Sequence, residues 1–351
     1  MQPKSYLLIL TVILFSLASS ACVPLLLSSS DEKAVKRTDK KTSSKSKTES
    51  KTKSRSKTAG NPGEPKILDV DKNADYVNAM GKEMPEMPDF DELSPEPGKV
   101  KGYVKDLSGN PLKGAQLGAR STAVGGFYSG SQGETDDDGY YEFEVPMGVA
   151  HFYNAGYAIE WGEDGQAALG LHPADGKLDS FASTTGGVEN FVLMPYGITS
   201  RENTSQSPHL PATYYGGAVH IGYSAAEAGD QYASTGSLID GSVIEITLTP
   251  EGEMFEGVAA PQFTVRKTVG FRSGFYINNL PLGKYRISVK TGDGEPLKME
   301  LNKPRGSEYG IKPSETSDSA VLTFLPGDAR ANMVAPQYGG WDMVGISVSR
   351  P

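Results

Sequence analysis

Residues 139–148 read Gly-Tyr-Tyr-Glu-Phe-Glu-Val-Pro-Met-Gly, and residues 274–283 read Gly-Phe-Tyr-Ile-Asn-Asn-Leu-Pro-Leu-Gly. The two stretches align without gaps. Each runs from a glycine, through alternating residues, to a Pro-x-Gly turn, which is typical of a β-strand that ends at a tight turn. The apolar phase differs by one position, with Tyr141 in one copy and Phe275 in the other, so we expect a β-bulge in one of them. The repeated stretch predicts two domains of the same β architecture.

Alternating segments flank both copies. Val100, Gly102 and Val104 alternate with polar or aromatic neighbours before the first copy, and residues 242–249 and 284–290 alternate around the second. The chain also has 41 glycines and 23 prolines among 351 residues. Because both residues are poor helix formers, this composition disfavours a helical bundle and favours a turn-rich, all-β protein.

The order of these elements resembles the carboxypeptidase regulatory-like domain, a prealbumin-like sandwich. The resemblance is carried by residues 98–104 (GKVKGYV), the turn 109–115 (GNPLKGA), the strand start 138–143 (DGYYEF) and Pro146-Met-Gly148. It covers residues 98–197, and residues 213–351 look like the same superfamily, joined through a linker at 198–212. The expected fold is all-β, with two prealbumin/transthyretin-like β-sandwich domains after a disordered N-terminal tether. In metallocarboxypeptidases a catalytic domain precedes this module, and the chain has no HxxE motif, so the resemblance implies a non-catalytic module.

The N-terminus has the features of an export signal. Lys4 is followed by thirteen uncharged residues at 6–18, which are too few to span a bilayer as a helix but fit a signal peptide ending at residue 21. Cys22, the only cysteine, then follows Ser20 and Ala21, which resembles the lipobox of bacterial lipoproteins. The resemblance implies acylation of Cys22, palmitate included, and a location at the cell membrane or outer membrane. The alternative is an ordinary cleaved signal that leaves Cys22 as a free thiol.

Residues 22–97 have the composition of a tether. Residues 28–58 contain 11 lysines and arginines against 4 acids, with almost no apolar residue, so they cannot offset the entropy of ordering. Residues 59–98 contain ten acids against three lysines, and we expect them to be extended, with a short helix near residues 71–80. The tether acts either as a spacer or, through its basic half, as a contact to anionic headgroups or wall polymers. The acidic remainder of the chain argues against a nucleic-acid partner.

Candidate ligand-binding residues are few. Clustered carboxylates at Asp136, Asp137 and Asp138 suit either a charged hairpin turn or a calcium site. Aromatic residues suit either the core or a platform that stacks on sugars. The aromatic candidates are Tyr128, Tyr153, Tyr157 and Trp161. No catalytic motif, other metal site or cofactor motif is present in the sequence, and a GxSxG nucleophile elbow is absent.

These features predict a non-catalytic, lipid-anchored cell-envelope protein whose β-sandwich domains serve as binding or spacing modules. Its partners would be the membrane, through Cys22, and envelope proteins or surface glycans. The main alternative is a carbohydrate-binding surface lipoprotein of a nutrient-uptake system, and a third is a hydrolase of unrecognised type.

Overall fold

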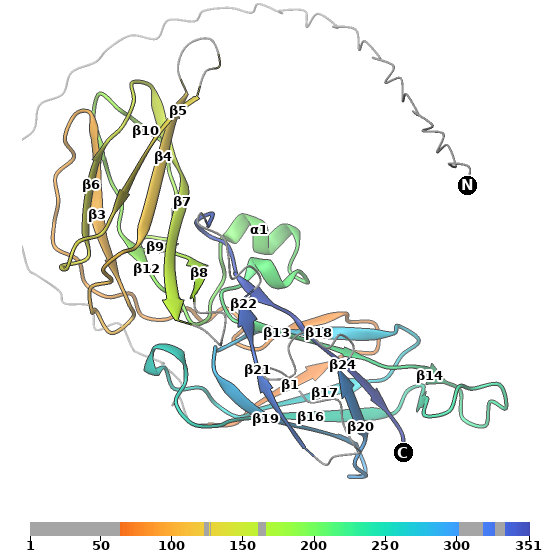
Figure 1. Ribbon diagram of the computed structural model, residues 1–351. Helices are drawn as coiled ribbons and strands as arrows, with labels where there is room; N and C mark the ends of the chain where they lie inside the picture. Colours follow the sequence, from red (N-terminus) through yellow and green to blue (C-terminus); the bar gives the residue numbers. More distant parts are fainter. Residues whose placement is uncertain (1–63, 123–125, 127, 161–165, 302–318, 327–333) are drawn as a thin grey trace, which may run out of the picture. The chain divides into compact units, whose positions relative to one another are not determined.

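The computed structural model describes residues 64–122, 126, 128–160, 166–301, 319–326 and 334–351. The described chain is almost entirely β, as the sequence predicts (Figure 1). Its helices are short: α1 (Arg201–Gln206) and the 3-10 turns η1 (Pro211–Thr213) and η2 (Phe255–Gly257). Cys22 and Trp161 lie outside the described residues.

The first sandwich is built from two sheets. One has the order β10-β7-β4-β5, with β8 also on β7, and in the other β3 pairs with β6, β11 and β12, and β12 pairs with β9. Side chains from both sheets share one core, for example Val104 of β3, Leu117 of β4 and Phe191 of β12. The strands are β3 (Lys99–Lys105), β4 (Gln116–Thr122), β5 (Tyr128–Glu134), β6 (Tyr140–Glu144), β7 (Val149–Glu160), β8 (Gln166–Gly170), β9 (His172–Pro173), β10 (Phe181–Ala182), β11 (Gly187–Val188) and β12 (Phe191–Val192).

The second sandwich packs the sheet β1-β17-β16-β19-β21 against the sheet β2-β18-β13-β24-β20. Its core includes Ile246 of β16, Phe275 of β18 and Ile346 of β24. The strands are β1 (Lys66–Val70), β2 (Tyr76–Asn78), β13 (Gly217–Gly222), β16 (Val243–Pro250), β17 (Phe263–Thr268), β18 (Gly274–Leu280), β19 (Lys284–Thr291), β20 (Lys298–Leu301), β21 (Ala320–Thr323) and β24 (Val344–Ser349). Two small pairs complete the fold: β14 (Ala225–Ala226) with β15 (Leu238–Ile239), and β22 (Leu325–Pro326) with β23 (Trp341–Asp342).

The repeated stretch has the same role in both sandwiches. In each copy it forms a strand, β6 or β18, then turns at Pro-x-Gly and enters a strand of the opposite sheet, β7 or β19. The neighbours also correspond, because β3 and β13 each pair antiparallel with the repeated strand and parallel with a late strand, β12 or β24. The two sandwiches therefore share this strand pairing.

The expected bulge lies in the second copy. Between the pairs Gly217↔Leu280 and Val219↔Ile277, β18 advances three residues while β13 advances two. Asn279 occupies the bulge with a φ of 60°, in the left-handed region that asparagine tolerates better than most residues. The bulge explains why Phe275 and Ile277 face the core of the second sandwich, whereas Tyr141 does so in the first.

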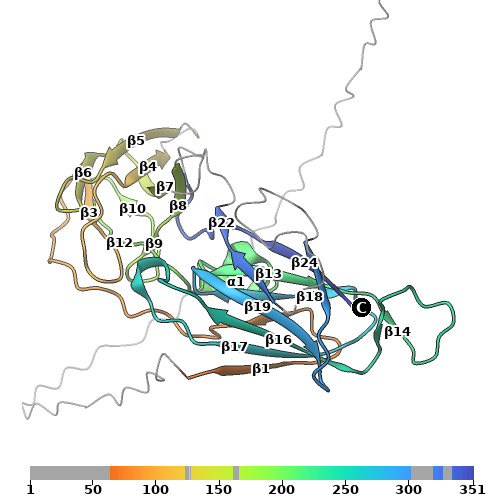
Figure 2. The same cartoon turned by 60° about the horizontal axis from the view of Figure 1, so that its bottom comes forward.

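The prediction of a disordered tether up to residue 97, with a short helix near residues 71–80, is wrong for residues 66–78. Those residues form β1, which pairs in parallel with β17, and β2, which pairs in parallel with β18. Figures 1 and 2 show β1, in orange, beside the blue-green β17. Val70, just before the turn, and Ala79 and Met80, just after β2, are buried in the second core. The prediction failed because β1 is short and lies in an acidic, proline-containing stretch with little strand pattern. Its partner β17 also lies almost two hundred residues further along the chain.

Residues on both sides of the first sandwich thus build the second one. The first sandwich, from β3 to β12, is inserted between β2 and β13. The predicted second domain, residues 213–351, therefore leaves out part of the core of the second sandwich. The predicted linker at 198–212 contains α1 and the start of η1. The remaining domain boundaries stay predictions.

Polar contacts hold the N-terminal strands in place. The ammonium of Lys267, whose side chain is fully buried, donates hydrogen bonds to the carbonyl oxygens of Asp71, Lys72 and Ala74 in the turn between β1 and β2. The carbonyl of Asp71 also accepts the N–H of Ala74, whereas the carbonyls of Lys72 and Ala74 receive their described hydrogen bonds from Lys267, so this contact fastens the turn.

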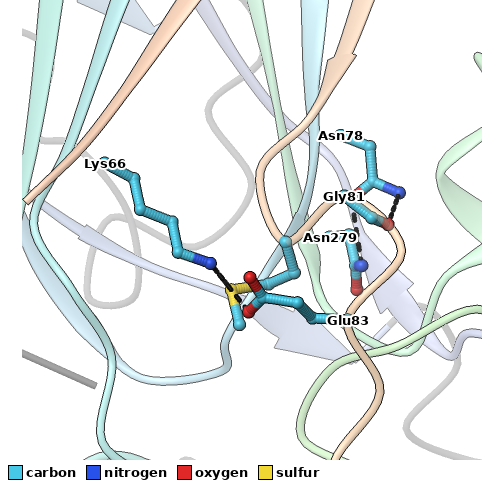
Figure 3. A network of polar contacts seen from close by, with 6 residues as sticks. Lys66, Asn78, Gly81, Glu83 and Asn279 are labelled. Atoms are coloured by element: carbon cyan, nitrogen blue, oxygen red, sulfur yellow. Dashed lines mark hydrogen bonds and ion pairs between the residues drawn. The ribbon is translucent and has the colours of Figure 1, made fainter. Parts of the chain in front are cut away.

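A second set of contacts lies around residues 78–83 (Figure 3). Asn279 donates from Nδ2 to Asn78 Oδ1 at 3.1 Å, and Asn78 donates to the carbonyl of Gly81 at 2.7 Å. Lys66 Nζ lies 2.8 Å from Glu83 Oε2. The bulged Asn279 thereby joins β18 to the end of β2.

Candidate binding face

The outer face of the sheet β10-β7-β4-β5 carries the aromatic candidates that the structure brings together. Register pairs Arg120 of β4 with Gly130 of β5 on one side and with His151 of β7 on the other. Alternation turns Leu117 and Ala119 into the core, so Arg120 points outward. We call the surface formed by Arg120, Tyr128, Gln132, His151 and Tyr153 the β4–β5–β7 face.

Tyr153 reaches this face through a break in the register. Between Gly118 and Ala119 of β4, β7 advances by an extra residue, from Asn154 to Phe152, and Tyr153 is the residue between them. Its ring lies over two glycines. A Cβ at Gly118 would lie 2.8 Å from the ring and 3.0 Å from its hydroxyl, and one at Gly130 would lie 3.6 Å from the ring. The absence of a side chain at position 118 is therefore what lets the ring lie close against the sheet.

Arg120 lies between two aromatic rings. Its guanidinium carbon is 5.3 Å from the centroid of Tyr128 and 6.0 Å from that of Tyr153, within the range of cation–π attraction. Tyr128 is 66% exposed, which leaves most of its ring surface free for a ligand. The hydroxyl of Tyr153 accepts a hydrogen bond from Gln132 Nε2 at 2.8 Å.

His151 orients the arginine. Arg120 Nε–H donates to His151 Nε2 at 2.8 Å, so the imidazole accepts through this nitrogen and is neutral. Partial burial, and secondarily the nearby Arg120 charge, lower the pKa of His151. The face therefore presents one positive charge at neutral pH, that of Arg120. Among the described residues, no carboxylate forms an ion pair with it.

Of the other two aromatic candidates, Tyr157 is not part of this face. Tyr157 is half-buried and packs against the core of the first sandwich. Trp161 lies outside the described residues, so its prediction is untested. The far end of β7 is covered by residues near Val334: Val334 N–H donates to Asn154 Oδ1 at 2.9 Å, and a Cβ at Gly156 would lie 3.3 Å from Val334. Among the described residues, the outer surface of the sheet is thus covered at one end and exposed at the end that carries Tyr128.

The three aspartates lie in the turn before β6. Asp136 Oδ1 accepts hydrogen bonds from the N–H groups of Asp138 and Tyr140, at 3.0 and 2.9 Å, and Asp137 forms an exposed ion pair with Lys113. This is the geometry of an Asx-capped turn. In the described part of the chain, no group of three or more His, Cys, Asp and Glu is arranged to hold a metal ion. The calcium hypothesis gains no support from this arrangement.

A hollow of about 340 Å³ is lined by residues of both sheets of the first sandwich, from β7, β10 and β11, and by Asp175, Lys177, Asp179 and Glu189 among others. Burial, and then the charges of Asp175 and Asp179, raise the pKa of Glu189 to about 8. Its carboxyl group is therefore mostly protonated at neutral pH and available as a hydrogen-bond donor.

A hollow of about 350 Å³ in the second sandwich is lined by hydroxyl groups and one histidine. His220, Ser224, Thr235, Ser273 and Ser349 contribute to it. Burial lowers the pKa of His220. Among the described residues, no hydrogen bond joins His220 to Ser224, Ser273 or Ser349.

The β4–β5–β7 face can stack flat apolar surfaces and bind an anion, but it has no nucleophile paired with a base. The sequence predicted Tyr128 and Tyr153 and missed Arg120, Gln132 and His151. The missing signal was β5 itself, because its Gly- and Ser-rich sequence has little strand character. Once β5 is known as a strand, its register to β4 brings Gln132 and Arg120 to this face, and the register of β7 to β4 adds His151.

No family model matches this sequence, and no match was found among curated proteins. Among solved structures, the Bacillus anthracis TIE protein is 15% identical, with a TM-score of 0.28 over 72% of this chain and 33% of that one. A streptococcal ancillary pilin is 14% identical, with a TM-score of 0.20 over 72% of this chain and 62% of that one. A C-terminal fragment of the pilus adhesin SpaC from Lactobacillus rhamnosus GG is 12% identical, with a TM-score of 0.22, covering 72% and 97%.

This chain spans less than two thirds of the first two of these proteins. TM-scores of this size transfer no function to it. Among the described residues, no helix is long and apolar enough to cross a membrane.

Proposed function

We propose that this is an exported, lipid-anchored cell-envelope protein whose two β-sandwiches bind or space without catalysing a reaction. The observation that carries the proposal is the position of Cys22, the only cysteine, directly after an uncharged segment and two small residues. An exported protein gains nothing from a lone thiol, whereas acylation there would use it. Several acyl chains would hold the protein firmly, since a single chain binds only marginally. The residue after Cys22 is Val23 rather than Asp, which favours the outer membrane in bacteria that have one.

The test is the substitution Cys22→Ser in the full chain, expressed in a bacterial host with lipoprotein processing. Metabolic labelling with a palmitate analogue should mark the parent and not the variant. The variant should move from the detergent-extractable membrane fraction to the soluble fraction. Ser28→Ala, which keeps the cysteine, is the matched control and should remain in the membrane. Equal membrane retention of Cys22→Ser would contradict the anchor.

The absence of catalysis is supported by the side chains of the candidate face. Its only histidine accepts a hydrogen bond from Arg120 instead of activating a hydroxyl group. Envelope proteins and surface glycans are the partners that this proposal allows. Turnover of peptide, ester or glycoside substrates by the purified chain would contradict it and favour a hydrolase.

A carbohydrate-binding protein of an uptake system is the second candidate function. It is favoured by one observation, the exposed Tyr128 ring beside Arg120 and Tyr153 on an open sheet face. Retention of the chain on immobilised polysaccharide, lost in Tyr128→Ala, would favour this candidate over a purely spacing function.

A further inference from the structure

The shape of the β4–β5–β7 face suits a flat ligand. Gly118 and Gly130 put no side chain between the strands and the ring of Tyr153, so this ring lies against the sheet. Tyr128, Arg120 and Tyr153 follow one another across β5, β4 and β7. Flat rings with a polar edge pack against the apolar C–H faces of pyranose rings while leaving the hydroxyl groups free to hydrogen-bond.

The positive charge of Arg120 favours flat ligands that carry an acidic group. The whole chain has a formal net charge of −9, yet this face presents the guanidinium of Arg120 without an ion-paired carboxylate among the described residues. The hydrogen bond to His151 uses Nε and leaves the two terminal nitrogens of the guanidinium for another acceptor. A guanidinium of this kind matches the two oxygens of a carboxylate.

Polar side chains at the edge of the face suit hydroxyl groups. Gln132 is exposed beside the Tyr153 hydroxyl, to which it donates. On the other side, Thr122 pairs with Val149, which is 55% exposed, so the open surface continues along the strands beyond Arg120. A ligand longer than one sugar would therefore find further surface along the same sheet.

We propose that the β4–β5–β7 face binds an acidic polysaccharide whose sugars carry carboxylates, with a uronate carboxylate on Arg120 and sugar rings stacked on Tyr128 and Tyr153. This inference rests on the surface function proposed above, because such polymers occur outside the cytosol. The two hollows fit this ligand less well: the one around Glu189 is lined by acids, and the one around His220 is lined by no lysine or arginine.

The probes are polygalacturonate, its methyl ester and neutral dextran, with affinity measured by calorimetry and by affinity electrophoresis on the purified full chain. The parent should bind polygalacturonate about tenfold or more tightly than the methyl ester, which keeps the sugar and loses the charge. Equal affinity for the acid and its ester would overturn the assignment of Arg120 to a carboxylate. No binding to any of the three polymers would overturn the proposal.

Three variants locate the site. Tyr128→Ala should weaken binding to polygalacturonate about tenfold. Arg120→Gln should reduce it to the level of the methyl ester, and Arg120→Lys should restore part of the loss. Tyr232→Ala and Arg272→Gln are matched controls, because both residues are exposed on the second sandwich, and each should bind like the parent. Far-ultraviolet circular dichroism and a melting curve establish that each variant is folded.

Binding that responds equally to the control substitutions would overturn the site. The same variants separate this proposal from the anchor, because Tyr128→Ala should remain in the membrane fraction while Cys22→Ser should still bind the polymer. Loss of binding with the anchor intact, or the reverse, identifies which of the two proposals fails.

Discussion

At the scale of single residues, two glycines on the β4–β5–β7 face should respond differently to the same added methyl group. Gly118→Ala places a Cβ 2.8 Å from the Tyr153 ring and must displace it, whereas Gly130→Ala makes an ordinary contact at 3.6 Å. We expect Gly118→Ala to weaken polygalacturonate binding about fivefold to tenfold, and Gly130→Ala to change it less than twofold. Calorimetry on both variants is the measurement. Equal losses would show that the position of the Tyr153 ring does not matter.

The half-buried carboxyl group of Glu189 should make stability depend on pH. Its pKa is raised to about 8 from the ordinary 4.5, so the folded protein holds a proton that the unfolded chain releases. The stabilisation is therefore fully present below about pH 4.5 and is lost as the pH rises through about 8. Glu189→Gln removes this loss, and we expect Tm to be about 2–4 °C higher than the parent at pH 8.5 and nearly equal at pH 5.

Thermal melts across this pH range test that expectation. Glu227→Gln, at an exposed site, is the matched control and should follow the parent at each pH. A constant difference between Glu189→Gln and the parent from pH 5 to 8.5 would rule out titration of Glu189 as the cause.

At the scale of the elements, the turn between β1 and β2 should depend on Lys267. Lys267→Met keeps most of the side-chain volume and removes the donor to three backbone carbonyls. We expect a loss of about 1–3 kcal/mol in the free energy of unfolding, because the turn loses the ammonium that donates to all three carbonyls. We also expect faster tryptic cleavage at Lys66 and Lys72. Urea unfolding and timed proteolysis measure the two effects.

The control for that substitution is Lys284→Met, at an exposed position of β19. It should change stability by less than about 0.5 kcal/mol. Unchanged cleavage at Lys72 in Lys267→Met would mean that β1 and β2 are held by strand pairing alone.

At the scale of the whole molecule, the first sandwich is inserted between β2 and β13. We therefore expect isolated fragments of the two sandwiches to differ in solubility. Residues 98–197 contain every strand of the first sandwich, so this fragment should be soluble with a β-type circular dichroism spectrum. Residues 213–351 lack β1 and β2, which leaves the edges of β17 and β18 unpaired and prone to association. We expect this fragment to aggregate in gel filtration and to become monomeric when a peptide of residues 64–81 is added. A stable monomer without the peptide would show that the N-terminal strands are dispensable.

Local pattern was sufficient for much of the fold. The alternation of Val100, Gly102 and Val104 predicted β3, and the repeated stretch predicted two related sandwiches with a bulge in one copy. The prediction from local pattern missed the strands β1 and β5. Each is a short or Gly-rich segment with little strand propensity of its own, and each is stabilised by pairing with β17 or β4. The prediction of the candidate face was incomplete for the same reason, because Arg120 becomes a neighbour of Tyr128 only through the register of β5 on β4.

The sequence by itself determined the all-β character of this chain, because alternation and turn residues act locally. The order of residues along the chain also carried the prediction of an export signal that ends at residue 21, directly before Cys22. Only the tertiary structure decided which strands complete the second sandwich and which side chains meet around Arg120. The physical reason is that an isolated strand leaves its backbone hydrogen bonds and its apolar face unsatisfied, so its place is decided by distant partners that the local sequence does not specify.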